Sequence, residues 1–134
     1  MRSTLNNITI LLLIAYLIIG IYLSINTGIS HDEFHEQLNW EVNFKSIKDF
    51  LLTGNYNDLL DYKDRYHGVG FNFLSQPFQL IISDGLSKYL DISEYGGLLV
   101  SKHVIVFIFF FISGLFYYKI LQILFNDKYF AIIS

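Results

Sequence analysis

Two long stretches without a charged side chain constrain this sequence more than any other feature. The first reads ITILLLIAYLIIGIYLSI over residues 8–25, and the second reads VIVFIFFFISGLFYY over residues 104–118. A helix needs about 20 mainly apolar residues to cross a bilayer. The first stretch reaches that length as a span over 8–29. The second reaches it over 104–125, because the ammonium of Lys119 can extend to the headgroups. The chain is therefore predicted to be an all-α, polytopic integral membrane protein.

The composition agrees with a membrane protein and excludes several functions. Hydrophobic residues make up 53% of the chain and charged residues 16%, against roughly 25% charged in an average soluble domain. The segment between the two spans, residues 30–103, carries eleven acidic and six basic side chains, a net charge of −5. Nucleic acid is not an expected partner, because binding a phosphate backbone needs clustered positive charge. The chain has no cysteine, which excludes disulfides and thiolate chemistry.

The sequences that flank the spans predict how the chain lies in the membrane. The first uncharged stretch is followed by Asn-Thr-Gly-Ile at 26–29, without the small-residue pattern of a cleavage site, so an uncleaved anchor is favoured over a signal peptide. Arg2 precedes the first span, and Lys119 and Lys128 lie at the end of the second. Because basic residues favour the cytoplasmic side, residues 30–103 are expected on the external, periplasmic side of an inner (plasma) membrane.

The external segment contains the pattern of a long helix beside the first span. Ser30-His31-Asp32-Glu33 fits a capping box, in which Glu33 reaches back to the residue that caps the helix. Gly54 stands where such a helix would stop. The apolar side chains of this helix fall in two rows at helical spacing: Phe34, Leu38 and Val42, and Trp40, Phe44, Ile47 and Leu51. This face is expected to lie in the membrane interface; packing on a small soluble core is the alternative.

The remainder of the chain predicts a loop, a second external helix and the beginning of a third span. Residues 55–70 are polar and rich in tyrosine, as in a loop with about one helical turn. Pro77 is expected in the first turn of the second helix, and Gly96-Gly97 is expected to break the chain before the span. Residues 129–134 resume apolar character and predict a third span that is cut off, so the chain is read as a fragment. The second helix follows from the spacing of Leu74, Phe78, Ile81, Ile82, Leu86 and Tyr89.

The densest polar cluster, residues 31–36, allows three interpretations. Glu33 can complete the capping box while Asp32 only favours the positive end of the helix. His31 and His35, one turn apart, can bind a divalent metal with a neighbouring carboxylate from Asp32 or Glu36. Asp32 can also act as a general base, or as a carboxylate that supports a metal, in a transferase. The residues alone leave all three open.

The order of these parts resembles the membrane glycosyltransferases of the GT-C fold, in particular the protein-mannosyltransferase-like branch (glycosyltransferase family 39). In that family an external Asp-Glu pair follows the first span, as Asp32-Glu33 does here, and an interfacial helix and a second span come next. The stretch DYKDRYHGVGFNF at 61–73 is similar to a loop of the bacterial members. KHVIVFIFFFISGLFYYKILQILF at 102–125 is similar to the start and body of their second span.

The resemblance implies an inverting transfer of a sugar from a polyprenyl-phosphate donor to an acceptor hydroxyl on protein, lipid or glycan. It implies a catalytic role for Asp32 and Glu33, with Asp32 taking the acceptor proton. It leaves the use of a divalent metal open, with His31 and His35 as the candidate ligands. The side chains that would bind the donor phosphate or the substrate lie in the matching stretches: Arg65, His67, Lys102 and His103.

Two other functions fit the same pattern of spans. One is a two-span membrane protein without enzymatic activity, whose acidic external segment binds a partner or assists assembly. The other is the leading part of a transporter, for which only Tyr16 and Gly20 interrupt the first span. The family's further spans are not in this sequence, so the fragment alone is expected to be inactive.

Overall fold

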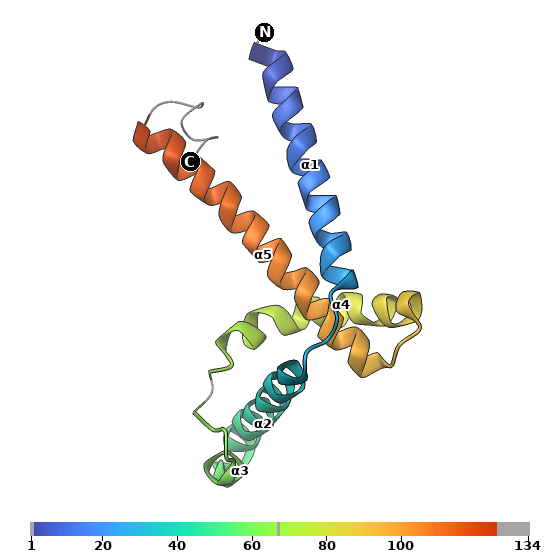
Figure 1. Cartoon of the computed structure of the whole chain (residues 1–134). Helices are drawn as coiled ribbons and strands as arrows, with labels where there is room; N and C mark the ends of the chain where they lie inside the picture. Colours follow the sequence, from blue (N-terminus) through green and yellow to red (C-terminus); the bar gives the residue numbers. More distant parts are fainter. Residues whose placement is uncertain (1, 67, 126–134) are drawn as a thin grey trace. The chain divides into compact units, whose positions relative to one another are not determined.

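The computed structural model describes residues 2–66 and 68–125, and all regular structure in these ranges is helical (Figure 1). The helices are α1 (Arg2–Asn26), α2 (His31–Thr53), α3 (Asn57–Asp61), α4 (Gly70–Leu90) and α5 (Glu94–Phe125). The predicted all-α class is confirmed at this level. His67 and the expected third span, 129–134, lie outside the described residues.

Two of the helices are long and apolar enough to cross a membrane. They are α1, over Asn7–Asn26, and α5, over Glu94–Phe125. The first ends three residues before the predicted limit of its span, and the second begins ten residues before the predicted start at 104. Both contain the uncharged stretches from which the spans were predicted.

The chain divides into two compact units. One unit contains residues 1–26 and 103–134, and the other contains residues 27–102. The second unit corresponds closely to the predicted external segment, 30–103. α5 contributes its first turns to this unit and the remainder of its length to the other.

In the first unit, a glycine allows α1 and α5 to approach closely. A Cβ added to Gly20 would lie 1.9 Å from the end of the Phe107 ring. The Tyr16 ring lies 5.7 Å from that of Phe107 and 6.1 Å from that of Phe111, measured between ring centroids. Tyr16 and Gly20, the two residues of α1 considered for the transporter alternative, therefore both lie against α5.

In the 27–102 unit, α2 begins and ends as its sequence predicts. Ser30 adopts an extended conformation before the helix, and the Glu33 carboxylate accepts a hydrogen bond from the Ser30 backbone N–H at 2.8 Å. Gly54 closes the helix with a φ of 75°, and its N–H donates to the Phe50 carbonyl at 2.8 Å. Glycine adopts this left-handed conformation without the steric cost that a Cβ would add. The single predicted turn after it is α3.

Two predictions about the later helices were wrong. Pro77 lies inside α4, which begins at Gly70, and not in the first turn. Gly96 and Gly97 do not break the chain, because α5 begins at Glu94 and runs through both. A Cβ at Gly97 would lie 2.7 Å from the Ser83 carbonyl oxygen and 2.7 Å from the Ser87 Cβ. The glycine serves close packing of α5 against α4 and not a helix end.

The interior of the 27–102 unit is largely polar. Trp40, 6% exposed, packs edge-on against Phe73 with ring centroids 4.7 Å apart, and this contact joins α2 to α4. Most other buried side chains of α2 and α4 are amides and hydroxyls: Gln37, Asn39, Ser46, Asn72, Ser75, Gln79 and Ser87. The apolar rows of both helices are mostly exposed, among them Phe44, Leu51, Leu74 and Ile81. The alternative in which α2 buries its apolar face on a small soluble core does not describe this unit.

Candidate functional site

The first turn of α2 holds two carboxylates with different surroundings. Glu33 is engaged by the Ser30 N–H, which is the part of the capping box that Glu33 was predicted to make. The carboxylate of Asp32, one residue earlier, is exposed, and among the described residues no hydrogen bond or ion pair is formed with it. Of the predicted catalytic pair, Asp32 has the side chain available to an external molecule.

His31 and His35 are brought together, as their spacing predicts. Their ring centroids lie 5.2 Å apart, with the rings nearly perpendicular at 84°. Within residues 2–66 and 68–125, no group of three or more His, Cys, Asp or Glu side chains is arranged to hold a metal ion. The predicted metal site therefore remains a prediction for these two histidines.

The Lys102 ammonium is paired with a carboxylate that the sequence did not identify as its partner. It forms an ion pair and hydrogen bond with the Glu36 carboxylate. The side chain of Lys102 is only 10% exposed, whereas that of Glu36 is 59% exposed. Nearby along the same two helices, Phe34 stacks on Tyr95 with ring centroids 5.8 Å apart. The pair connects α2 to the start of α5 across 66 positions of sequence.

Arg65 has a local structural role after α3. Its guanidinium donates to the carbonyl oxygens of Leu60 at 2.8 Å and Tyr62 at 3.5 Å, and it lies over the Tyr66 ring, 4.8 Å from the centroid. In the described part of the chain, no contact joins it to Asp32 or Lys102. The remaining predicted binding residue that can be placed, His103, is half-buried on α5, in the other unit. The structure thus gathers the Asp32 region and the Lys102 pair on α2 but does not bring Arg65 to them.

A small polar pocket lies away from all of these residues. It is formed by the last turns of α2 and the residues around the start of α3, and is lined by Ser46, Asp49, Asn55, Tyr56, Asn57 and Asp58. None of the predicted site residues lines it. The pocket follows from the way α3 is attached to α2, and it does not contain the predicted chemistry.

Two raised pKa values accompany the attachment of α3 to α2. The hydrogen bond from Lys45 to the Asp58 carboxylate, 2.6 Å long, raises the pKa of Lys45. Burial raises the pKa of the Tyr62 hydroxyl, which donates to the Asn39 side-chain oxygen at 2.5 Å. Both shifts therefore accompany contacts that hold residues 57–62 on α2.

No family model, curated protein or solved structure matches this chain.

Proposed function

We propose that this chain forms the acceptor side of a membrane glycosyltransferase of the GT-C type. In this proposal α1 and α5 cross the membrane, and residues 27–102 lie at its outer face. The observation that carries the proposal is the Asp32 carboxylate, exposed and without a partner among the described residues, in the first helical turn after α1. A carboxylate in this position can meet a substrate held at the membrane surface.

The chemistry assigned to Asp32 is that of a general base. It takes the proton of the acceptor hydroxyl as the hydroxyl oxygen attacks the anomeric carbon of the donor sugar. The bond between that carbon and the lipid phosphate breaks with inversion, and the phosphate leaves with the bonding electrons. The leaving phosphate needs nearby positive charge. Lys102 is the candidate in this unit, and its bond to Glu36 means that a phosphate would have to compete with that carboxylate.

The test is Asp32→Asn in the full-length protein, assayed in membranes with a panel of polyprenyl-phosphate sugars. Transfer should fall by roughly 10²–10⁴-fold, the usual contribution of a positioned acid–base group. Asparagine keeps the size of the side chain but cannot take the proton. Activity is compared at equal amounts of membrane-inserted protein.

Glu33→Gln is the matched control, because glutamine can still accept the hydrogen bond from the Ser30 N–H. In this proposal Glu33 caps the helix and takes no part in the transfer, so the variant should keep most of the activity. If Asp32→Asn transfers sugar at a near-normal rate, Asp32 is a helix-end residue and the catalytic assignment is wrong. If the unmodified full-length protein transfers none of the sugars, the glycosyltransferase proposal itself fails.

One observation favours a second function, that of a membrane protein which binds a partner. Apolar side chains at the end of α2 are widely exposed, Leu51 by 76% and Leu52 by 72%. A partner helix could cover them. Copurification of a specific protein that Leu51→Asn and Leu52→Asn abolish, together with the absence of sugar transfer by the unmodified full-length protein, would favour this function over the enzyme.

A further inference from the structure

The polarity of α4 is reversed relative to that of a helix on the surface of a soluble protein. Ser75 and Gln79 are completely buried, and Gln79 donates a hydrogen bond to the Ser75 hydroxyl at 2.7 Å. On the outward side, Leu74 is 65% exposed, Leu80 60% and Ile81 77%. An amphipathic helix in water places these two classes of side chain the other way round.

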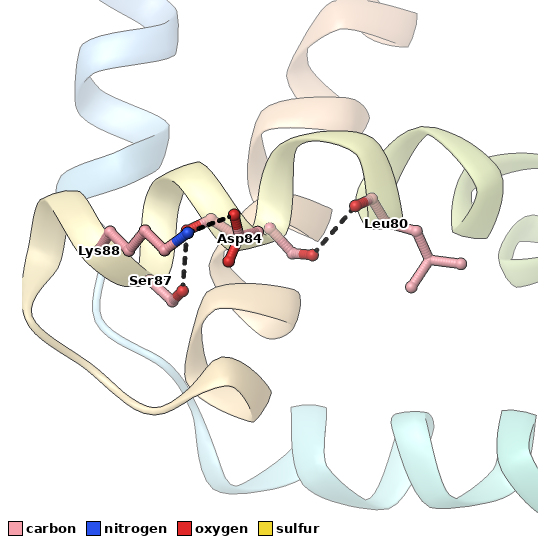
Figure 2. A network of polar contacts seen from close by, with 5 residues as sticks. Leu80, Asp84, Ser87 and Lys88 are labelled. Carbon is pink, nitrogen blue, oxygen red and sulfur yellow. Dashed lines mark hydrogen bonds and ion pairs between the residues drawn. The ribbon is translucent and has the colours of Figure 1, made fainter.

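The charges of α4 are confined to one end. No Asp, Glu, Lys or Arg lies between Arg65 and Asp84. In the last turns, the Lys88 ammonium pairs with the Asp84 carboxylate at 2.7 Å (Figure 2). The first two-thirds of the helix therefore presents an uncharged surface, and an ion pair marks where that surface ends.

Near that boundary, serine hydroxyls bond to the helix's own backbone (Figure 2). The Ser83 hydroxyl donates to the Leu80 carbonyl at 3.4 Å, and the Ser87 hydroxyl donates to the Asp84 carbonyl at 3.0 Å. Such bonds satisfy polar groups without water. They suit a helix whose surroundings offer few hydrogen-bond partners.

α4 is also directly attached to a helix that can span a membrane. It ends at Leu90, and α5 begins at Glu94. The close approach at Gly97, whose added Cβ would meet Ser83 and Ser87 at 2.7 Å, holds the two helices together. An apolar surface that continues from a spanning helix meets lipid before it meets any other apolar medium.

We propose that the uncharged outer surface of α4, formed by Leu74, Leu80 and Ile81, lies in the lipid bilayer at the boundary between headgroups and acyl chains. Asp84 and Lys88 lie at the aqueous edge of the same helix. The occupant of this surface is lipid and not a protein partner, and the assignment does not depend on sugar transfer. Trp40, which the sequence placed on the expected interfacial face of α2, is buried against Phe73 and is not part of this lipid-facing surface.

The experiment uses tryptophan as a probe of depth. Trp40 is the only tryptophan in the chain, and Trp40→Phe keeps an aromatic ring against Phe73 while removing its emission. In this background, Ile81→Trp and, separately, Leu74→Trp place a probe on the proposed surface. Tyr66→Trp is the control: Tyr66 is 85% exposed, lies in the charged loop beside Arg65, and retains an aromatic ring for the Arg65 guanidinium.

Each full-length variant is reconstituted into phosphatidylcholine vesicles with and without brominated acyl chains. The probes at 81 and 74 should lose most of their emission to bromine near the headgroups and little to acrylamide in the water. The probe at 66 should respond in the opposite way. Two probe positions are used so that the test still works when one of the substitutions prevents the protein from inserting into the vesicles.

Two outcomes would overturn the proposal. Quenching of the probes at 81 and 74 by acrylamide but not by brominated lipid would place the surface in water. Resistance to both quenchers would show that protein covers it.

Discussion

At the scale of single residues, the ion pair of Lys102 with Glu36 should respond differently to the loss of each partner. The two substitutions should lower the unfolding free energy by unequal amounts. Glu36→Gln leaves the ammonium of Lys102 almost buried without a counter-charge. We expect a loss of about 1–3 kcal/mol in unfolding free energy. Lys102→Met removes the buried charge, keeps most of the side-chain volume, and leaves an exposed carboxylate that water can solvate. That variant should lose less than about 1 kcal/mol.

The measurement is thermal or denaturant unfolding of both variants in the same detergent. An equal loss for the two, or a larger loss for Lys102→Met, would mean that the pair does not behave as a buried cation with an exposed partner. The same two variants separate structure from binding. If Lys102 also binds the donor phosphate, Lys102→Met loses affinity for donor while remaining folded.

Residues also differ in how far the sequence predicts their role. Glu33 and Gly54 act on groups within four positions of themselves, so local rules place both correctly. The partner of Lys102 is 66 positions away, and nothing in a single sequence selects Glu36 from the eleven carboxylates of residues 30–103. Arg65 was predicted to bind donor phosphate, yet its guanidinium contacts the carbonyls of Leu60 and Tyr62, which are local contacts that the sequence pattern did not suggest.

At the scale of helices, the contact of α4 with α5 depends on the missing side chain of Gly97. Gly97→Ala places a Cβ against the Ser83 carbonyl and the Ser87 Cβ, two atoms of a helix that cannot move aside easily. We expect it to cost about 1–3 kcal/mol through overpacking. Gly114→Ala, in the same helix, is the control because no atom lies within 4 Å of the added Cβ.

Gly114→Ala should stabilise the helix by up to about 1 kcal/mol, the difference in helix propensity between alanine and glycine. Circular dichroism during heating compares the two variants directly. If both glycines respond alike, close packing at Gly97 is not what holds α4 to α5.

The helices themselves were largely predictable, whereas their packing was not. α2 and α3 follow from capping, glycine and spacing, which are properties of neighbouring residues. The helix break predicted at Gly96-Gly97 is wrong, because the same glycine pair can mark either the end of a helix or a place where two helices pack closely. The sequence also did not predict that the polar face of α4 is buried, because the rule that apolar side chains face inward applies to helices surrounded by water.

At the scale of the whole molecule, the proposed topology places Asn57 and Asn126 on opposite sides of the membrane. The chain has no cysteine, so a single Asn57→Cys or Asn126→Cys can be detected without background. Asn57→Cys should react with a membrane-impermeant maleimide in intact cells, because it opens α3 in the proposed external segment. Asn126→Cys should react only after the membrane is permeabilised.

Labelling of Asn57→Cys only after permeabilisation would remove the external active site from the proposal. Labelling of both positions in intact cells would mean that α5 does not cross the membrane. The two spans are predicted from length and composition, and both helices satisfy these criteria. The labelling experiment tests whether the helices cross the membrane.

The contact between Gly20 and Phe107 has a consequence for the order in which the protein is made. The two residues are 107 − 20 = 87 positions apart, and at synthesis rates of about 5–20 residues per second the second emerges about 4–17 s after the first. During that interval α1 has no Phe107 beside Gly20. In the proposed topology α1 is then a solitary helix in lipid, an environment that suits its uncharged residues 8–25, with Ile18 and Ile19 exposed.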